Sequence, residues 1–226
     1  MSLRTSINST RALRTKSIVK PSNLYRSIVT AHRPVVSPTT VKQYRMASSV
    51  IQATAKAAHS TFASLVSASP IKVGDAIPDV EVRINGLEEK VNFSKLTGKN
   101  VLVLVPGAFS GTCSQQVPGY IKHFSAYQSK GVKDVYVVAV NDIFVVNAWK
   151  ENLTEGKGET VKFAADDSAA LAHALGLVLD GQAIFGGPRL KRGAIVFDNG
   201  KVTHLTVEPN PGEVTTSHAD EVLKAL

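Results

Sequence analysis

Continuous aliphatic runs alternate with turn signals along residues 75–226, and this pattern predicts alternating strands and helices. Residues 101–105 read Val-Leu-Val-Leu-Val, a run typical of a strand that is covered on both faces. Residues 135–140 form a second run of the same kind. Because such strands lie in the interior of a parallel sheet, we expect helices on both faces of this sheet.

Apolar positions at helical spacing follow each of these strands. The helix expected after residues 101–105 carries Val117, Tyr120, Ile121, Phe124 and Tyr127. The helix expected after residues 135–140 carries Phe144, Val145, Ala148 and Trp149. We expect Trp149, Phe144 and Tyr120 in the core or in a subunit interface. A short strand near residues 161–164, a small helix through Leu171, Ala174 and Leu175, and a last helix over residues 218–225 complete the pattern.

Two hairpins frame these units. Alternating apolar residues at 80–84 and 91–93 flank an Asn-Gly turn signal, and residues 193–197 and 202–207 flank Asp198-Asn199-Gly200. Strand–helix–strand units followed by an antiparallel hairpin and a helix predict an α/β domain over residues 71–226. This is the element order of a thioredoxin fold, with a mixed sheet, helices on both faces and an added N-terminal β-hairpin.

Charge separates this domain from the preceding residues. Residues 1–74 contain 11 of the 26 Lys and Arg residues and no Asp or Glu, so the net charge of +8 comes from this part of the chain. An acid-free, Arg- and Ser/Thr-rich segment with scattered apolar residues is typical of a mitochondrial presequence, which we expect over residues 1–45. The alternative is a basic arm that binds nucleic acid or anionic lipid.

The segment 46–70 is rich in Ala and Ser, and we expect it to be a linker or a second leader segment. Met46 is a possible internal start that would give an additional cytosolic form. No apolar run approaches 18 residues, so no membrane insertion is expected.

Cys113 is the only cysteine of the 226 residues, and it lies between the strand at 101–105 and the helix that follows. With Ser110 or Thr112 as a helix cap, Cys113 would fall in the first helical turn. Unpaired N–H groups and the positive end of the helix dipole favour a thiolate there, and the thiolate is the reactive form. The alternative is a free cysteine that packs as a small hydrophobic side chain.

A single cysteine excludes an intramolecular disulfide, a CxxC redox pair and a multi-cysteine zinc site. Any partner thiol of Cys113 must therefore come from another molecule. No cofactor and no metal are expected, and Asp166-Asp167 is interpreted as a helix cap. A cysteine–histidine hydrolase is disfavoured because His123, on the same predicted helix, is about 15 Å from Cys113 along the axis.

Four motifs in order resemble the type II peroxiredoxins, the subfamily that includes peroxiredoxin five. They are Pro106-x-x-x-Ser110-x-x-Cys113, Val117-Pro118-Gly119-Tyr120, residues 139–149 (Ala-Val-Asn-Asp-x-Phe-Val-x-x-Ala-Trp) and Leu190-Lys191-Arg192. The resemblance runs from about residue 71 to residue 226. It implies an enzyme that reduces hydrogen peroxide and alkyl hydroperoxides, with no cofactor and no nucleic acid as a partner.

The resemblance also implies roles for individual residues. Cys113 would be the peroxidatic cysteine, Ser110 would hydrogen-bond the peroxide and the thiolate, and Pro106 would shield the sulfur. The family arginine falls on Arg192, with Arg189 as the neighbouring alternative. Phe109 would lie at the rim of the pocket and in a dimer contact.

Family members with an intramolecular resolving cysteine place it where this chain reads Val-Thr-Thr-Ser at residues 214–217. The chain therefore resembles a one-cysteine version whose sulfenic acid is reduced by an external thiol, either glutathione with glutaredoxin or thioredoxin directly. A homodimer is expected. The alternative function is a peroxide sensor or chaperone-like signalling protein that uses the same cysteine without high turnover.

Overall fold

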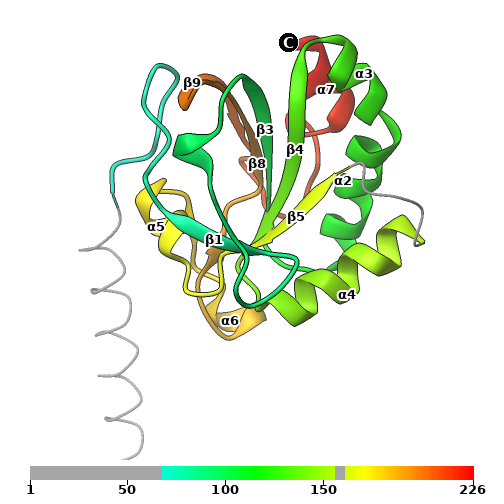
Figure 1. Cartoon of the computed structure of the whole chain (residues 1–226). Helices are drawn as coiled ribbons and strands as arrows, with labels where there is room; N and C mark the ends of the chain where they lie inside the picture. The colour runs from blue at the N-terminus through cyan, green and yellow to red at the C-terminus, as the bar shows by residue number, and fades with distance from the viewer. Residues whose placement is uncertain (1–67, 156–160) are drawn as a thin grey trace, which may run out of the picture. The chain divides into compact units, whose positions relative to one another are not determined.

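The computed structural model describes residues 68–155 and 161–226, and within them seven strands form one mixed sheet in the order β2-β1-β5-β4-β3-β8-β9 (Figure 1). The strands of this sheet are β1 (Glu81–Ile84), β2 (Lys90–Asn92), β3 (Lys99–Val105), β4 (Val132–Ala139), β5 (Lys162–Ala165), β8 (Gly193–Asp198) and β9 (Lys201–Val207). A separate two-stranded sheet consists of β6 (Val178–Leu179) and β7 (Arg189–Leu190). The thioredoxin-type α/β fold is confirmed.

Strand β3 lies at the centre of the sheet and is buried from Asn100 to Val105. It pairs in parallel with β4, with Val101 opposite Val135, and antiparallel with β8, with Val101 opposite Val196. The prediction of an interior strand is thus confirmed, and its parallel pairing holds on one side only. The antiparallel neighbour β8 brings Arg192, the residue before Gly193, toward the end of β3.

Helices cover both faces of the sheet. They are α2 (Gly111–Lys122), α3 (Phe124–Ser129), α4 (Ile143–Thr154), α5 (Ala170–Ala174), α6 (Gln182–Phe185) and α7 (Ala219–Lys224), with a 3₁₀ turn η2 (Phe93–Lys95). Val101, Val103 and Val105 of β3 pack into a core cluster with α2, α3, α4 and α7, whereas Leu102 and Leu104 pack into a second cluster with α5. Figure 1 shows α2 and α4 on one side of the sheet and α5 on the other. Alternation along one strand therefore separates the two cores, as the strand period requires.

Both predicted hairpins are present. Val82 of β1 lies opposite Val91 of β2, and the turn between them contains Asn85 with a φ of 56°. In the second hairpin Asp198 pairs with Lys201, and the two residues between them, Asn199 and Gly200, both have positive φ. A two-residue turn of this kind matches the twist of the flanking strands.

Helix α4 buries Trp149, as predicted, but Phe144 lies outside the core, so the subunit interface stays the prediction for Phe144. The helix buries Ile143, Val146 and Trp149, whereas Phe144 is 65% exposed. Apolar residues lie on more than one side of this helix, so two sets of residues fit a helical period. The sequence pointed to the set with Phe144, Val145, Ala148 and Trp149, and the structure buries the set with Ile143, Val146 and Trp149. Packing against β5 and α2, rather than periodicity, selects the face.

The helix predicted through Tyr127 is interrupted at His123, which ends α2 and begins α3. Tyr127 nevertheless remains buried, and its hydroxyl donates to Ala219 O at 2.6 Å. The elements β6, α6 and β7 were not predicted. The expected leader at residues 1–45 and the part of the linker up to residue 67 lie outside the described residues. Within the described part of the chain, no helix is long and apolar enough to span a membrane.

Candidate active site

Cys113 lies in the first turn of α2, directly after the loop that leaves β3. Its side chain is fully buried, and Pro106 at the start of the loop is buried as well. Ser110 occupies the predicted N-cap position with an extended backbone, but its side chain makes no capping hydrogen bond. The hydroxyl of Ser110 therefore does not cap the helix, and the hydrogen bond to peroxide and thiolate that the resemblance implies for it stays a prediction. Thr112, the other predicted cap, donates its hydroxyl to Gly212 O at 3.4 Å.

The loop between β3 and α2 is held by the neighbouring strand end. Ala108 N donates to Asn141 Oδ1 at 2.9 Å, and Asn141 directly follows Val140 at the end of the β4 segment. Phe109 has a φ of 60°, a left-handed conformation that is uncommon for a residue with a β-carbon, and it is 54% exposed. Phe109 thus projects toward solvent from the loop that carries the cysteine.

Arg192 contacts Cys113 directly. Its Nη2 donates to Cys113 Sγ at 3.3 Å, and the arginine is only 2% exposed. The strand register explains this contact, because Gly193 of β8 lies opposite Leu104 of β3 and so brings Arg192 to the end of β3. Arg189, the alternative arginine, instead donates to Phe185 O and Pro188 O, both at 3.0 Å.

Two further hydrogen bonds of Arg192 go to neutral oxygens. Arg192 Nε donates to Pro211 O at 2.9 Å, and Nη1 donates to Gln116 Oε1 at 2.7 Å. Gln116 is buried and in turn donates from Nε2 to Ser217 Oγ at 3.1 Å. Sequence reasoning missed Gln116, Pro211 and Ser217. Only Gln116 carried a signal, because a residue three positions after Cys113 lies on the same helix face.

Glu208, also missed from sequence, is a buried carboxylate beside this network, with an exposure of 5%. Its Oε1 accepts from Thr215 N at 2.7 Å, Ser217 N at 2.8 Å and Ser217 Oγ at 2.8 Å, and its Oε2 accepts from Thr215 Oγ1 at 2.6 Å. Burial raises the pKa of the Glu208 carboxyl, but the hydrogen bonds from Thr215 and Ser217 outweigh it, so the pKa lies below its ordinary value. The carboxylate is therefore ionised at neutral pH.

This arrangement suits chemistry at sulfur in which negative charge develops. The N-terminus of α2 and the guanidinium of Arg192 both favour an anion at Cys113. A thiolate there is a nucleophile, and the same donors can stabilise an oxyanion that leaves when an oxygen–oxygen bond is cleaved. A guanidinium retains its charge when buried, which suits this position.

The comparisons with known proteins agree with this geometry. The model of the Redoxin family matches residues 72–223. Peroxiredoxin-2B of Arabidopsis thaliana is 42% identical over 164 residues, which cover 70% of this chain and 99% of that protein. This chain belongs to the type II peroxiredoxins. As a peroxiredoxin it is a thiol peroxidase.

Further relatives support the assignment of this peroxiredoxin. Peroxisomal membrane associated protein 20 of Schizosaccharomyces pombe is 41% identical over 156 residues, covering 69% of this chain and 99% of that protein. The structure of reduced Prx3 from Vibrio vulnificus in complex with H₂O₂ is 38% identical with a TM-score of 0.63, covering 69% of this chain and 99% of that one. Peroxiredoxin 5 from Alvinella pompejana is 28% identical with a TM-score of 0.62, covering 69% and 97%.

Other residues weighed from sequence lie in different roles in the peroxiredoxin domain. His123 Nε2 is 3.2 Å from Asp220 Oδ1 rather than beside Cys113. Asp166 accepts from Leu171 N at 3.1 Å and Ala172 N at 2.8 Å, which is the capping role expected of it. Burial raises the pKa of Asp166, although these backbone hydrogen bonds oppose the rise. No group of three or more metal-ligating side chains is found among the residues described.

Proposed function

We propose that Cys113 is the peroxidatic cysteine of this peroxiredoxin, and that Pro106, Ser110 and Arg192 complete its peroxide site. The observation that carries the proposal is the 3.3 Å hydrogen bond from Arg192 Nη2 to the buried Sγ in the first turn of α2. Ser110 supports it because its hydroxyl does not cap the helix. The proposed substrates are hydrogen peroxide and alkyl hydroperoxides.

In the proposed reaction the Cys113 thiolate attacks one peroxide oxygen and forms a sulfur–oxygen bond while the oxygen–oxygen bond breaks. The cysteine is oxidised to a sulfenic acid, and the peroxide is reduced to an alkoxide or hydroxide, which takes a proton from water. Arg192 would stabilise the negative charge as it moves from sulfur to the leaving oxygen, and the Ser110 hydroxyl would donate a hydrogen bond to the peroxide. Pro106 would limit the access of water to the sulfur.

The sulfenic acid requires an external thiol because the chain has no second cysteine. A first thiol would form a mixed disulfide with Cys113 and release water, and a second thiol would then free Cys113 and form a disulfide of the reductant. We propose glutathione with glutaredoxin, or thioredoxin directly, as the source of these thiols. The segment 214–217 contains no cysteine that could act in place of an external thiol.

Steady-state peroxide consumption by residues 68–226 tests the proposal, with Cys113→Ser as its matched control. We expect many turnovers per cysteine with at least one of the two reductants, and none with Cys113→Ser, because a hydroxyl cannot form the sulfenic acid. Thiol-dependent turnover that persists in Cys113→Ser would overturn the role of Cys113. Consumption that stops after one equivalent with both reductants would instead favour the peroxide sensor.

A homodimer is also part of the proposal. Phe109 supports it, since a large apolar side chain that is 54% exposed next to the active loop is suited to burial against a second copy. Sedimentation velocity of the native protein and of Phe109→Asp tests this. We expect a dimer for the native protein and a shift toward monomer for the variant, whereas a native monomer would contradict it.

We propose that residues 1–45 direct the protein to mitochondria, on the basis of their acid-free, Arg-rich composition. A fluorescent cargo fused to these residues should enter mitochondria, and replacement of Arg4, Arg11 and Arg14 by Gln should weaken its import. Nuclear or cytosolic cargo would favour the alternative of a nucleic-acid-binding arm. Expression from Met46 alone tests whether a cytosolic form exists.

A further inference from the structure

Residues 208–217 form a strap between β9 and α7, and the side chain of Glu208 closes it. Glu208 immediately follows β9, while its carboxylate accepts hydrogen bonds from Thr215 and Ser217 at the far end of the strap. The backbone N–H of Glu208 donates to Arg192 O at 2.9 Å, so Glu208 begins the strap directly beside the arginine strand. One buried side chain thus joins the two ends of the segment.

The closed strap holds two hydrogen-bond acceptors of Arg192 in place, one directly and one through Ser217. Within the described residues, Arg192 makes three side-chain hydrogen bonds, and the one to Cys113 is the only one that does not depend on this segment. The strap residue Pro211 accepts from Nε. Gln116, which accepts from Nη1, is itself held by Ser217 at the end of the strap.

The carboxylate of Glu208 also sets the direction of the hydrogen bonds that lead to Arg192. An ionised carboxylate can only accept, so the Ser217 hydroxyl donates its proton to Glu208 and offers a lone pair to Gln116 Nε2. The amide oxygen of Gln116 is then the atom that faces Arg192. This orientation gives the guanidinium an acceptor and leaves Nη2 for the sulfur.

We propose that Glu208 is a positioning residue for Arg192: its carboxylate closes the strap, and the closed strap fixes the guanidinium against Cys113 Sγ. This inference rests on the proposed function, in which Arg192 stabilises the charge that moves from Cys113 to the peroxide. Glu208 itself touches neither the sulfur nor the substrate site. It acts through Ser217, Gln116 and Pro211.

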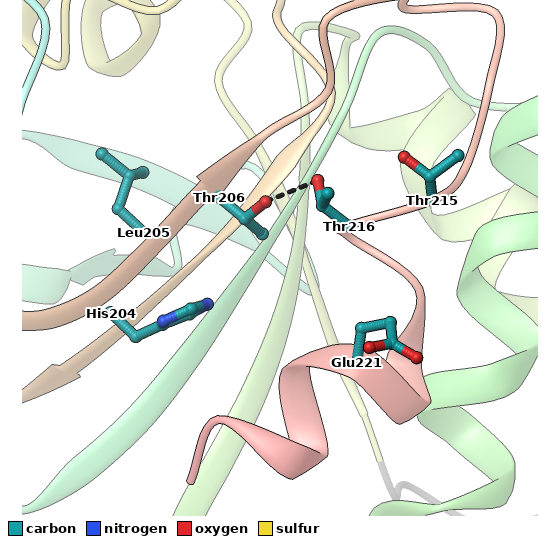
Figure 2. A pocket seen from close by; sticks show the side chains of 6 residues that line it. All are labelled: His204, Leu205, Thr206, Thr215, Thr216 and Glu221. Carbon is teal, nitrogen blue, oxygen red and sulfur yellow. Dashed lines mark hydrogen bonds between the residues drawn. The ribbon is translucent and has the colours of Figure 1, made fainter.

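A second tie holds the strap on its outer side. Thr206 Oγ1 of β9 donates to Thr216 Oγ1 at 2.6 Å, across an open groove of about 500 Å³ lined also by His204, Leu205, Thr215 and Glu221 (Figure 2). This tie is one exposed hydrogen bond between neutral hydroxyls, and such a bond is weaker than a hydrogen bond to a charged group. The four bonds to Glu208 therefore dominate the closure of the strap.

The test compares Glu208→Ala with Glu208→Gln in the full chain. We expect Glu208→Ala to slow the reaction of Cys113 with hydrogen peroxide by about tenfold or more, approaching the 10²–10³-fold typical for loss of a whole oxyanion donor. The pH profile of Cys113 alkylation by iodoacetamide should move to higher pH as well. Glu208→Gln should retain most of the rate, because its amide oxygen can keep the three bonds made at Oε1.

The matched control is Glu213→Gln, which changes an exposed glutamate of the same strap whose carboxylate accepts a hydrogen bond from Asn210. It should leave the rate and the alkylation profile unchanged. If Glu208→Ala does not fold, Thr215→Val replaces it; this variant loses the bond to Oε2 and should slow oxidation by about threefold.

A folded Glu208→Ala, or in its place Thr215→Val, with a native oxidation rate and a native alkylation profile would overturn the positioning role. A lower melting temperature without a change in either readout would overturn it too, because that result describes a merely structural residue. Failure of the proposed function is distinguishable, since it would appear as persistent peroxidase turnover in Cys113→Ser. The positioning role is supported only if Cys113→Ser is inactive and Glu208→Ala moves both readouts.

Discussion

Arg192 is a buried cation whose direct hydrogen-bond partners, among the described residues, include no carboxylate. Two of its donors go to the neutral oxygens of Pro211 and Gln116, and the third goes to Cys113 Sγ. Burial of an uncompensated charge is costly, so an anion at the sulfur stabilises the arginine just as the arginine stabilises the anion. The charge is consequently available to the sulfur and, in the proposed reaction, to a peroxide bound beside it.

Replacement of Arg192 by Met should therefore slow the oxidation of Cys113 far more than replacement of Arg189. We expect a loss on the order of 10²–10³ for Arg192→Met, because an electrostatic stabiliser of the leaving oxyanion is removed. Stopped-flow oxidation with hydrogen peroxide measures the rate. Arg189→Met is the matched control and should stay within about threefold, since Arg189 bonds to backbone oxygens of its own loop. A larger loss for Arg189→Met would reverse the assignment.

The sequence placed Cys113 in a helical first turn, because the strand run, the small polar residues and the helical period all surround it. The family resemblance assigned the arginine to Arg192 and left Arg189 as the alternative, because the spacing of the residues alone does not decide between them. That choice depends on the register of β8 against β3, in which Gly193 lies opposite Leu104. Glu208 and Ser217 could not be identified from sequence for a similar reason. They are brought close to Gln116 only by the folded sheet and the strap.

At the scale of elements, Trp149 joins α4 to α2 and to the sheet. Its indole is fully buried, its Nε1 donates to Ser114 Oγ at 3.2 Å, and its ring meets Phe163 edge-on with a centroid distance of 5.7 Å. Ser114 directly follows Cys113. The packing of α4 thus supports the helical turn that carries the cysteine.

We expect Trp149→Ala to lower the free energy of unfolding by about 3–5 kcal/mol, because it leaves a large cavity and an unpaired hydroxyl. Phe144→Ala on the same helix is the control. Phe144 is 65% exposed, so its removal should change the free energy of unfolding by no more than about 0.5 kcal/mol. Urea denaturation measures both. Equal losses would indicate that Phe144 is buried, as its spacing in the sequence suggested.

Because Glu208 closes the strap as an anion, the free energy of unfolding should decrease at acid pH. The pKa of Glu208 in the folded protein lies below its ordinary value of 4.5. The stabilisation that the ionised carboxylate gives to the folded state is therefore fully present above pH 4.5, and it is lost as the pH falls through the lower pKa of the folded protein. We expect the native protein to be more stable than Glu208→Gln at pH 7. The difference should shrink as the pH is lowered below about 5. A difference that grows on acidification would contradict a depressed pKa.

At the scale of the whole molecule, the alternation of aliphatic runs, helical stripes and turn signals was enough to predict the mixed sheet and its two helical layers. The strands of residues 101–105 and 135–140 form its centre as β3 and β4. The segment with β6, α6 and β7 was missed because its elements have only two to four residues, too short for a period to be recognised. The fold also determines how the single cysteine can be oxidised, because Cys113 is buried behind its own loop.

With one buried cysteine in the chain, stoichiometric oxidation should leave chains that are not covalently cross-linked and that each carry a sulfenic acid at Cys113. No intramolecular disulfide can form, and a cross-link between two Cys113 residues is disfavoured because each sulfur is fully buried beside Arg192. Intact-mass spectrometry should therefore detect the monomer plus one oxygen after one equivalent of hydrogen peroxide, and plus two oxygens in excess peroxide. When glutathione is added with the first equivalent, the monomer plus one glutathionyl group should appear instead.

Cys113→Ser is the control for this experiment and should gain neither oxygen nor glutathione under the same conditions. The product should depend on whether glutathione is added before or after excess peroxide. Glutathione added after excess peroxide should fail to modify the protein, because a sulfinic acid no longer reacts with thiols. A covalent dimer as the main product of one equivalent would refute the one-cysteine cycle, since it would require two sulfurs to leave their buried sites and meet. It would also mean that the loop between β3 and α2 opens far enough, upon oxidation, for Cys113 to reach a second molecule.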